Sequence, residues 1–273
     1  MQLLQAGRND FHVHTCASDA AKDCTVERIA RVAEGLQLRG IGITDHRWAR
    51  NAARGWEPGR ADDDLSSFLR TRDEIRALQG EAVRLYLSWE VDYLEGGLYS
   101  FDPEAHLPML DYVLLAYHCI GQRSKDEPAA IARRLLDIYL AMAQEPYANL
   151  IAHPFYLPPP PDRHAEVLRH ITDAQFAEVF LAMKEHGKAA EITAYQFNAD
   201  LRGVDEMVRM YAVAHSTGVK CTLDSDAHSL WDLGESLRCS YVLASMGFTD
   251  ADFVDYQGMM ALRSLAARSP NGS

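Results

Sequence analysis

The chain alternates short apolar runs with longer stretches in which apolar residues recur at helical spacing. Seven short apolar runs suit β-strands: DFHV (10–13), GIGIT (40–44), VRLYLSWEV (83–91), DYVLLAYH (111–118), NLIAH (149–153), AAEIT (189–193) and VKCTLDS (219–225). The stretches between them predict helices over 25–38, 63–80, 127–145, 172–187 and 203–217, and about 230–268 predicts further helix.

Strands that alternate with helices pair in parallel through crossover connections, so the pattern predicts the α/β class. Seven such strands favour a barrel over about 8–230, with a C-terminal helical part over about 231–268, in one domain of 1–273. An open doubly wound sheet is the alternative, but its usual glycine-rich turn after the first strand is absent. The proline run in FYLPPPPDRH (155–164) predicts an extended loop, as a connector or as a wall over the site.

Composition and charge narrow the class of protein. No apolar run reaches the roughly 20 residues that span a bilayer, and the polar start MQLLQAGRND is too short for a secretory signal. We therefore expect a cytoplasmic protein that does not bind a membrane. The five cysteines form no CxxC pair, which indicates a reducing compartment. A net charge of −12 argues against binding a long nucleic-acid duplex, but it permits a small phosphorylated substrate.

Histidine placement is the strongest chemical signal in the chain. Six of the eleven histidines fall at or just past the C-terminal end of a predicted strand, namely His12, His14, His46, His118, His153 and His228. Glu90 and Asp226 share such positions, and Asp19 adds an oxygen five residues after His14. Functional side chains gather at this face in barrels of parallel strands, so the set predicts a metal site. The other five, His106, His164, His170, His186 and His215, are interpreted as surface residues.

The donor types also limit the choice of ion. Imidazole and carboxylate without thiolate suit zinc, manganese or iron rather than a sulfur-rich structural site. The donors outnumber what one tetrahedral ion can use, so we expect two or three divalent ions with a bridging carboxylate.

The ordered motifs DFHVHT, ITDH, Glu90, YH at His118, AHP at His153 and DAH at Asp226 and His228 resemble the PHP family of polymerase and histidinol phosphatase domains. The resemblance covers roughly 10–228 and implies a distorted seven-stranded, TIM-like β/α barrel with the metal site at the C-terminal face of the strands. It implies one ion on His12, His14, Glu90 and Asp226, a second on Glu90, His118 and His153, and a third on Asp19, His46 and His228. Members with an aspartate at position 19 have glycine next, where this chain has Ala20.

Such a site suits phosphate chemistry. Three divalent ions bring six positive charges, and Glu90, Asp226 and Asp19 return three, which leaves a surplus that fits a phosphate dianion. Metal-bound water can ionise near a pH of about 7, and we expect the resulting hydroxide to attack phosphorus in line. Asp10 and Asp45 are expected to orient ligating imidazoles, or else to cap turns. Arg202 and Arg123 are expected to contact the substrate.

The leading hypothesis is a metal-dependent phosphoesterase that acts on a small phosphorylated metabolite or nucleotide. One alternative is an amidohydrolase-type enzyme that cleaves C–N or ester bonds, although such barrels commonly use a bridging lysine, and no lysine ends a mid-barrel strand here. Another is a catalytically silent metal-binding domain that binds a partner. Monoester or diester preference, the native metal and the oligomeric state are left open.

Overall fold

The computed structural model describes residues 4–47, 65–78, 82–94, 98–99, 102–118, 126–157, 161–194 and 204–266. Within these ranges, no helix combines the length and the apolar character that crossing a membrane requires.

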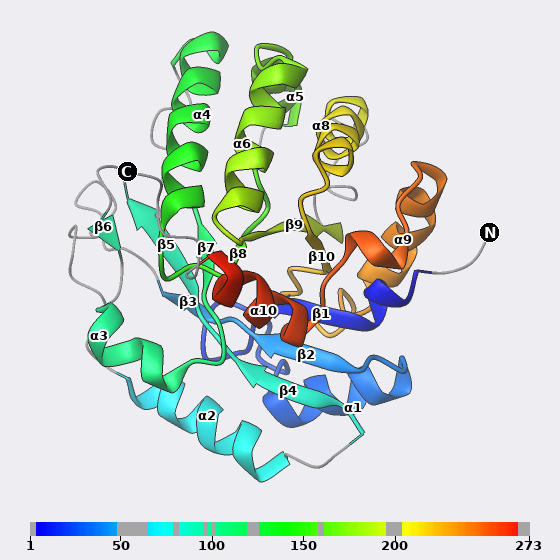
Figure 1. Cartoon of the computed structure of the whole chain (residues 1–273). Helices are drawn as coiled ribbons and strands as arrows, with labels where there is room; N and C mark the ends of the chain where they lie inside the picture. Colours follow the sequence, from blue (N-terminus) through cyan, green and yellow to red (C-terminus); the bar gives the residue numbers. More distant parts are fainter. Residues whose placement is uncertain are drawn as a thin grey trace.

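Strands and helices alternate along the chain, as the sequence predicts (Figure 1). The strands are β1 (Asn9–Val13), β2 (Gly40–Ile43), β3 (His46–Arg47), β4 (Arg84–Leu87), β5 (Glu90–Leu94), β6 (Leu98–Tyr99), β7 (Leu114–Ala116), β8 (Leu150–Ile151), β9 (Ala189–Thr193) and β10 (Cys221–Asp224). The α-helices are α1 (Val26–Gly35), α2 (Ser66–Leu78), α3 (Pro103–His106), α4 (Pro128–Gln144), α5 (Pro161–Arg169), α6 (Asp173–Glu185), α8 (Val204–Thr217), α9 (Glu235–Ser245) and α10 (Tyr256–Ala266). Three 3₁₀ turns complete the described elements, over Gln5–Arg8, Leu107–Met109 and Asp250–Asp252.

The strands form two sheets in the described residues. One sheet has the order β1-β2-β4, and the other has the order β10-β9-β8-β7-β5-β3, with β6 antiparallel to β5. All other strand pairs are parallel. The helices α4, α6 and α8 stand together on the outside of the β7–β10 strands, while α1 and α2 lie beside β2 and β4 (Figure 1). The predicted α/β class with parallel pairing is therefore confirmed.

The two sheets meet at β1 and β10. Val13 forms a parallel bridge with Ala227, and the His14 N–H donates to the Ala227 carbonyl over 2.9 Å. Closure into a seven-stranded barrel stays a prediction. The predicted strand count is wrong, since ten strands lie in the described residues.

Two local predictions also need correction. The predicted strand 83–91 is two strands, because the chain changes partners at Ser88: β4 pairs with β2, whereas β5 pairs with β3 and β7. The predicted loop 155–164 gives way to helix α5 at Pro161. Proline is tolerated in the first turn of a helix because that N–H has no intrahelical acceptor, so a proline run can end where a helix begins.

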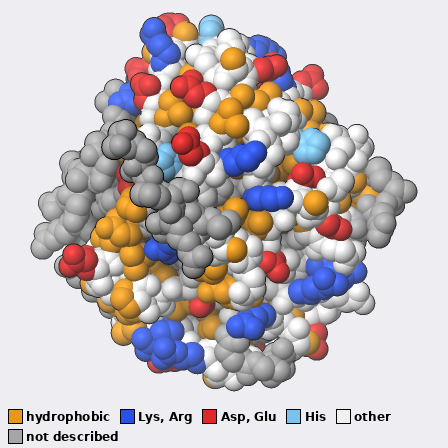
Figure 2. All heavy atoms as spheres, in the orientation of Figure 1, with side chains coloured by type: hydrophobic (Ala, Val, Ile, Leu, Met, Phe, Trp, Pro, Cys, Tyr) orange, Lys and Arg blue, Asp and Glu red, His pale blue; other side chains and the backbone are white. Residues whose placement is uncertain are grey.

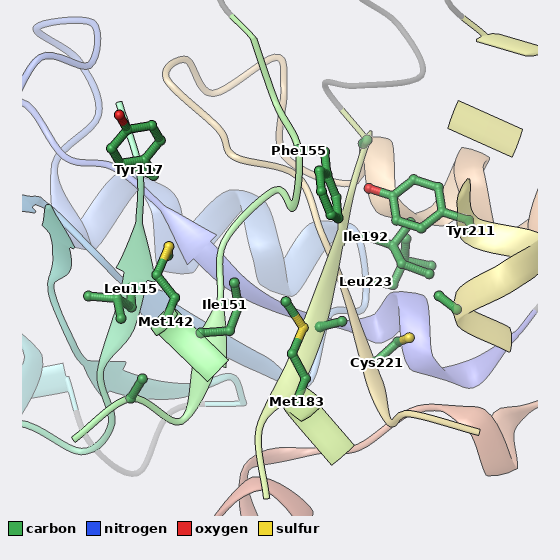
Figure 3. Close-up of a cluster of buried hydrophobic side chains, with 14 of the residues drawn as sticks. Leu115, Tyr117, Met142, Ile151, Phe155, Met183, Ile192, Tyr211, Cys221 and Leu223 are labelled. Atoms are coloured by element: carbon green, nitrogen blue, oxygen red, sulfur yellow. The ribbon is translucent and has the colours of Figure 1, made fainter. Parts of the chain in front are cut away.

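Apolar side chains fill two layers, one outside and one inside the curved strands. Figure 3 shows part of the outer layer, where Leu115, Ile151 and Ile192 from the strands face Met142 and Met183 from α4 and α6. The inner layer is a separate cluster that joins side chains from several strands to α10: Phe11, Tyr112, Leu114, Ala116, Leu150, Ala152, Ala189 and Met259. This inner layer supports the base of the site described below.

Gly42 in β2 gives a stability prediction. A Cβ there would collide with the hydroxyl of Tyr112, which donates to the Phe11 carbonyl, and would lie 3.0 Å from the Phe11 Cα. We expect Gly42→Ala to lower the free energy of unfolding by about 1–3 kcal/mol through overpacking. Urea unfolding followed by circular dichroism measures this. Gly35→Ala is the matched control, because nothing lies within 4 Å of a Cβ at Gly35, and it should be neutral or stabilising. Equal effects of the two changes would contradict the prediction.

Candidate metal centre

The site starts from β1, whose end places two imidazoles side by side. His12 lies in the strand and His14 follows it, and their Nε2 atoms are 3.0 Å apart in a fully buried position. The register of β1 against β2 shifts between Asp10 and Val13. Such irregularities re-aim side chains, and here Phe11 packs into the inner layer while both histidines reach the strand end.

Glu90, the first residue of β5, lies at the centre of the cluster. Its Oε2 is 3.3 Å from His12 Nε2 and 2.8 Å from His46 Nδ1. Its Oε1 is 3.2 Å from His118 Nε2 and 3.0 Å from His153 Nε2. The two oxygens of one buried carboxylate therefore face two different groups of imidazoles, which is the arrangement that a bridging ligand needs.

Two of the site residues follow strands with an unusual backbone. His153 follows β8 with φ +23°, and Asp226 follows β10 with φ +57°. Side chains other than glycine rarely take positive φ, and such residues cluster at functional sites. The turn brings Asp226 Oδ1 to 3.3 Å from His12 Nε2 and to 3.2 Å from His14 Nε2.

A second group lies nearer to solvent. His46 Nε2 is 3.4 Å from Asp19 Oδ2, and His228 Nε2 is 3.3 Å from Asp19 Oδ1. The rings of His14 and His228 are 4.2 Å apart, so this group adjoins the inner one. Donor atoms of His14, Asp19, His46 and His228 can all lie within 4.8 Å of one another. The side chains of Asp19 and His228 are 46% and 38% exposed, so solvent and small molecules can reach this edge.

The structure thus brings all nine predicted ligands together. Two further groups of donor atoms satisfy the same 4.8 Å limit, one with His12, His14 and Glu90, the other with His46, Glu90 and His118. How the ligands are shared among ions stays a prediction.

The donor atoms fit divalent cations. His12 Nδ1 lies 2.7 Å from a Glu191 oxygen, so Nδ1 carries a proton and Nε2 is the nitrogen that faces Glu90 and Asp226. Glu90 Oε2 is buried and faces His46 Nδ1 at 2.8 Å and His12 Nε2 at 3.3 Å. Lone pairs that face each other in a dry interior repel unless a cation lies between them. The separations of 3.0–3.5 Å also suit ligands on one tetrahedral zinc, whose bonds of about 2.0–2.1 Å imply edges of about 3.4 Å.

Two buried carboxylates beside the cluster were not predicted from the sequence. Glu191 in β9 holds His12 Nδ1 at 2.7 Å and accepts the backbone N–H of His153 over 2.5 Å. Asp92 Oδ1 lies 2.6 Å from His118 Nδ1. Both fix which imidazole nitrogen faces the cluster. The sequence contains a feature that could have identified each of them. Asp92 follows Glu90 by two residues and so shares its face of β5, and Glu191 is a charged residue inside an apolar strand.

Asp10 and Asp45, which the sequence predicts as the carboxylates that orient the imidazoles, form hydrogen bonds to other groups. Asp10 Oδ1 accepts the backbone N–H of Ser225 over 2.9 Å, and Asp45 accepts the N–H and the hydroxyl of Thr15, both over 2.7 Å. These bonds hold the loops after β10 and β1, as the capping alternative expects. Orientation of an imidazole by Asp10 or Asp45 stays a prediction.

The predicted substrate arginines, Arg123 and Arg202, lie outside the described residues. Arg47, which directly follows His46, lies in β3 and is buried, with its guanidinium 5.1 Å from the ring centre of Trp89. His164, expected at the surface, is buried in α5, and its Nε2 is 3.0 Å from the Phe155 carbonyl. A helix that packs a histidine inward was missed there because the preceding prolines argued against a helix.

The buried acids and imidazoles of the cluster strongly shift one another's pKa values. Burial opposes ionisation of Glu90, but His46, His12 and His118 lower the pKa of Glu90 well below its usual value. Burial likewise opposes protonation of His12, yet Glu191, Asp226 and Glu90 raise its pKa well above 6.5. His14, buried beside His46, has its pKa lowered to about 3, so it presents a free lone pair. The ionised acids attract positive charge into a buried site, which metal ions can supply.

The parallel α/β fold, with nine imidazole and carboxylate side chains gathered near its strand ends, indicates an α/β protein of the metal-binding class. No family model matches the chain. A probable phosphatase of Thermoanaerobacter sp. (strain X514) is 30% identical over 245 residues, which are 88% of this chain and 87% of that protein. A probable phosphatase of Acetivibrio thermocellus is 28% identical over 230 residues, or 82% and 81% of the two chains. The chain belongs to the family of these probable phosphatases.

A solved structure has the same fold. Histidinol phosphate phosphatase from Lactococcus lactis, in complex with zinc, L-histidinol and phosphate, matches with a TM-score of 0.63 at 18% identity. The match covers 90% of this chain and 98% of that one.

Proposed function

We propose that this protein is a metal-dependent phosphoesterase of the PHP family that hydrolyses a small phosphorylated substrate. The convergence of eight His and Asp side chains around Glu90 carries the proposal. The family of probable phosphatases supports it, as does the fold shared with a histidinol phosphate phosphatase that binds zinc and phosphate. The bridge between Val13 and Ala227 supports closure of the strands into the barrel of that family.

The residues that would hold the ions are His12, His14, Asp19, His46, Glu90, His118, His153, Asp226 and His228. Divalent ions held there would lower the pKa of water and offset the negative charge of a phosphoryl group. Glu191 and Asp92 keep the Nδ1 protons of His12 and His118, so that both Nε2 atoms stay available. Asp19 and His228 form the exposed edge at which substrate enters.

The two missed carboxylates change the charge count and favour a third ion. Three divalent ions supply six positive charges, and Glu90, Asp226, Asp19, Glu191 and Asp92 return five. This count covers the acids that contact the imidazoles of the cluster, whereas Asp10 and Asp45 accept hydrogen bonds from Ser225 and Thr15. Three ions leave the cluster positive and attractive to a phosphate, whereas two ions would leave it negative.

Small substrates are favoured over nucleic-acid duplexes. On the face shown in Figure 2, acidic and basic side chains are interspersed rather than gathered by sign. An amidohydrolase-type bridging lysine is also disfavoured. Lys188 is buried just before β9, and its ammonium donates to the Ala148 carbonyl over 2.8 Å at the end of the strand opposite the site.

The test is phosphate release after metal exchange. We expect protein stripped by a chelator to lose activity on p-nitrophenyl phosphate and on a panel of phosphorylated metabolites. Reloading with zinc, manganese or iron should restore it, with two to three ions per chain by elemental analysis. A fully loaded protein that releases no phosphate from any phosphoester would overturn the proposal. Hydrolysis of amides alone would favour the amidohydrolase alternative, and a protein that retains no metal would favour the silent domain.

A further inference from the structure

Trp231 is the most exposed large apolar side chain among the described residues. Its exposed fraction is 91%, whereas Tyr241 and Leu181, two of the others, reach 47% and 49%. Indole is a large apolar surface, and proteins usually bury most of it. An exposed tryptophan therefore leaves a sizeable apolar area available for contact with another molecule.

The backbone holds Trp231 in a defined place. The Asp232 N–H donates to the Ser229 carbonyl over 3.1 Å, and the Ser229 hydroxyl donates to Asp232 Oδ2 over 2.8 Å. Leu230 packs against the core and Leu233 is buried, so the residues around Trp231 anchor the turn while the indole projects outward. A fixed platform costs a ligand less ordering entropy than a mobile one.

The same turn belongs to the edge of the metal centre. It follows Asp226 and His228 directly, and the Ala21 N–H donates to the His228 carbonyl over 2.8 Å, which ties the turn to the loop that carries Asp19. Trp231 is three residues beyond His228, so their Cα atoms are at most about 11 Å apart. The backbone of Trp231 thus lies within about 11 Å of the exposed edge at which the proposed function brings in substrate.

The surroundings of Trp231 define the chemistry of its ligand. Asp232, next to Trp231, gives the turn a negative charge, whereas Glu235 is paired with the Arg238 guanidinium over 2.9 Å. A neutral or protonated ring is favoured there over an anionic one. Stacking recognises the flat face of a ring and tolerates many ring types.

We infer that Trp231 is a specificity-determining residue, which stacks on a planar aromatic or heteroaromatic group in the alcohol part of the phosphoester. This rests on the proposed function, because the metal centre holds the phosphoryl group while Trp231 holds the ring. Phosphoesters of ring-bearing alcohols and nucleosides are then better substrates than those of aliphatic alcohols.

The experiment compares substrates with and without a ring. We expect Trp231→Ala to lower kcat/KM for a nucleoside 5′-monophosphate by about tenfold, within the range that alanine substitution of a stacking aromatic gives. Glycerol phosphate hydrolysis should change less than about twofold, and Trp231→Phe should retain most of the preference. Tyr241→Ala is the matched control, since it removes a half-exposed aromatic on α9. Equal loss on both substrates, or no loss on either, would overturn the inference.

A binding measurement separates this inference from the proposed function. In the metal-loaded protein, titration with a nucleoside that lacks phosphate should quench tryptophan fluorescence. That quench should disappear in Trp231→Phe, although the other three tryptophans of the chain remain. Quenching without phosphatase activity would retain the ring site and reject the phosphoesterase. If the protein hydrolyses phosphoesters but the nucleoside quenches wild type and Trp231→Phe equally, the phosphoesterase is retained and the ring site is rejected.

Discussion

Glu90→Gln is expected to abolish metal retention and phosphoester hydrolysis together. Glutamine keeps the size of the side chain but removes the charge that lies among the imidazoles of His12, His46, His118 and His153. Its NH₂ group would also point two donors at one of the imidazole groups, where a cation needs an acceptor. Activity should fall by more than about a hundredfold, which is the upper end of the loss when a partner outside the ligand set is removed.

Elemental analysis and initial rates at several metal concentrations measure the effect. Glu185→Gln removes the same charge from the exposed end of α6 and should leave both properties unchanged. Thermal unfolding without metal should show a lower melting temperature for Glu90→Gln than for wild type, because the neighbouring imidazoles hold the pKa of Glu90 well below its usual value and the ionised carboxylate therefore stabilises the apoprotein. A Glu90→Gln protein that retains its ions and turnover would show that the carboxylate does not bridge them.

Most of the ligand set could be predicted from the sequence, because the position of each ligand depends mainly on the strand that carries it. A parallel strand directs its last side chains to one edge of the sheet, so His12 and His153 could be placed from the ends of apolar runs alone. Glu90 was expected at the end of the strand 83–91, but it is the first residue of β5. Glu191 and Asp92 were missed because they lie inside strands, where a charged residue usually argues against burial. Only the pairing of β8 with β9 brings Glu191 beneath His153.

The boundaries of elements were predicted less well than their order. The break at Ser88 depends on a change of partner strands, and no pattern within 83–91 encodes a partner. The two-residue strand β3 at His46 exists because Glu90 pairs beside it, which is again a long-range cause. Such short pairings matter for function here, since they join two of the proposed ligands through the backbone.

Glu191→Gln tests whether an interior carboxylate sets the state of the metal centre. Glu191 accepts two donors, His12 Nδ1–H and the His153 N–H, whereas glutamine can accept with only one terminal atom. The other donor then faces an NH₂ group, and His12 loses the charge that makes its Nε2 a stronger base. Metal affinity at alkaline pH should fall by about 10- to 100-fold.

The pH dependence of metal binding distinguishes this role from a general loss of stability. Glu191 is among the carboxylates that raise the pKa of His12, so protons compete with metal at His12 up to a higher pH than 6.5. Removing its charge lowers that pKa, and the acid limb of metal binding should move to lower pH even as the maximal affinity falls.

Asp224→Asn is the matched control. Burial raises the pKa of Asp224 well above its usual value, so the amide replaces a neutral acid whose Oδ1 accepts the Phe11 N–H. An equal shift of the pH dependence of metal binding in both variants would assign the effect to packing. A shift seen only in Glu191→Gln would show that Glu191 in β9 sets the pKa of His12.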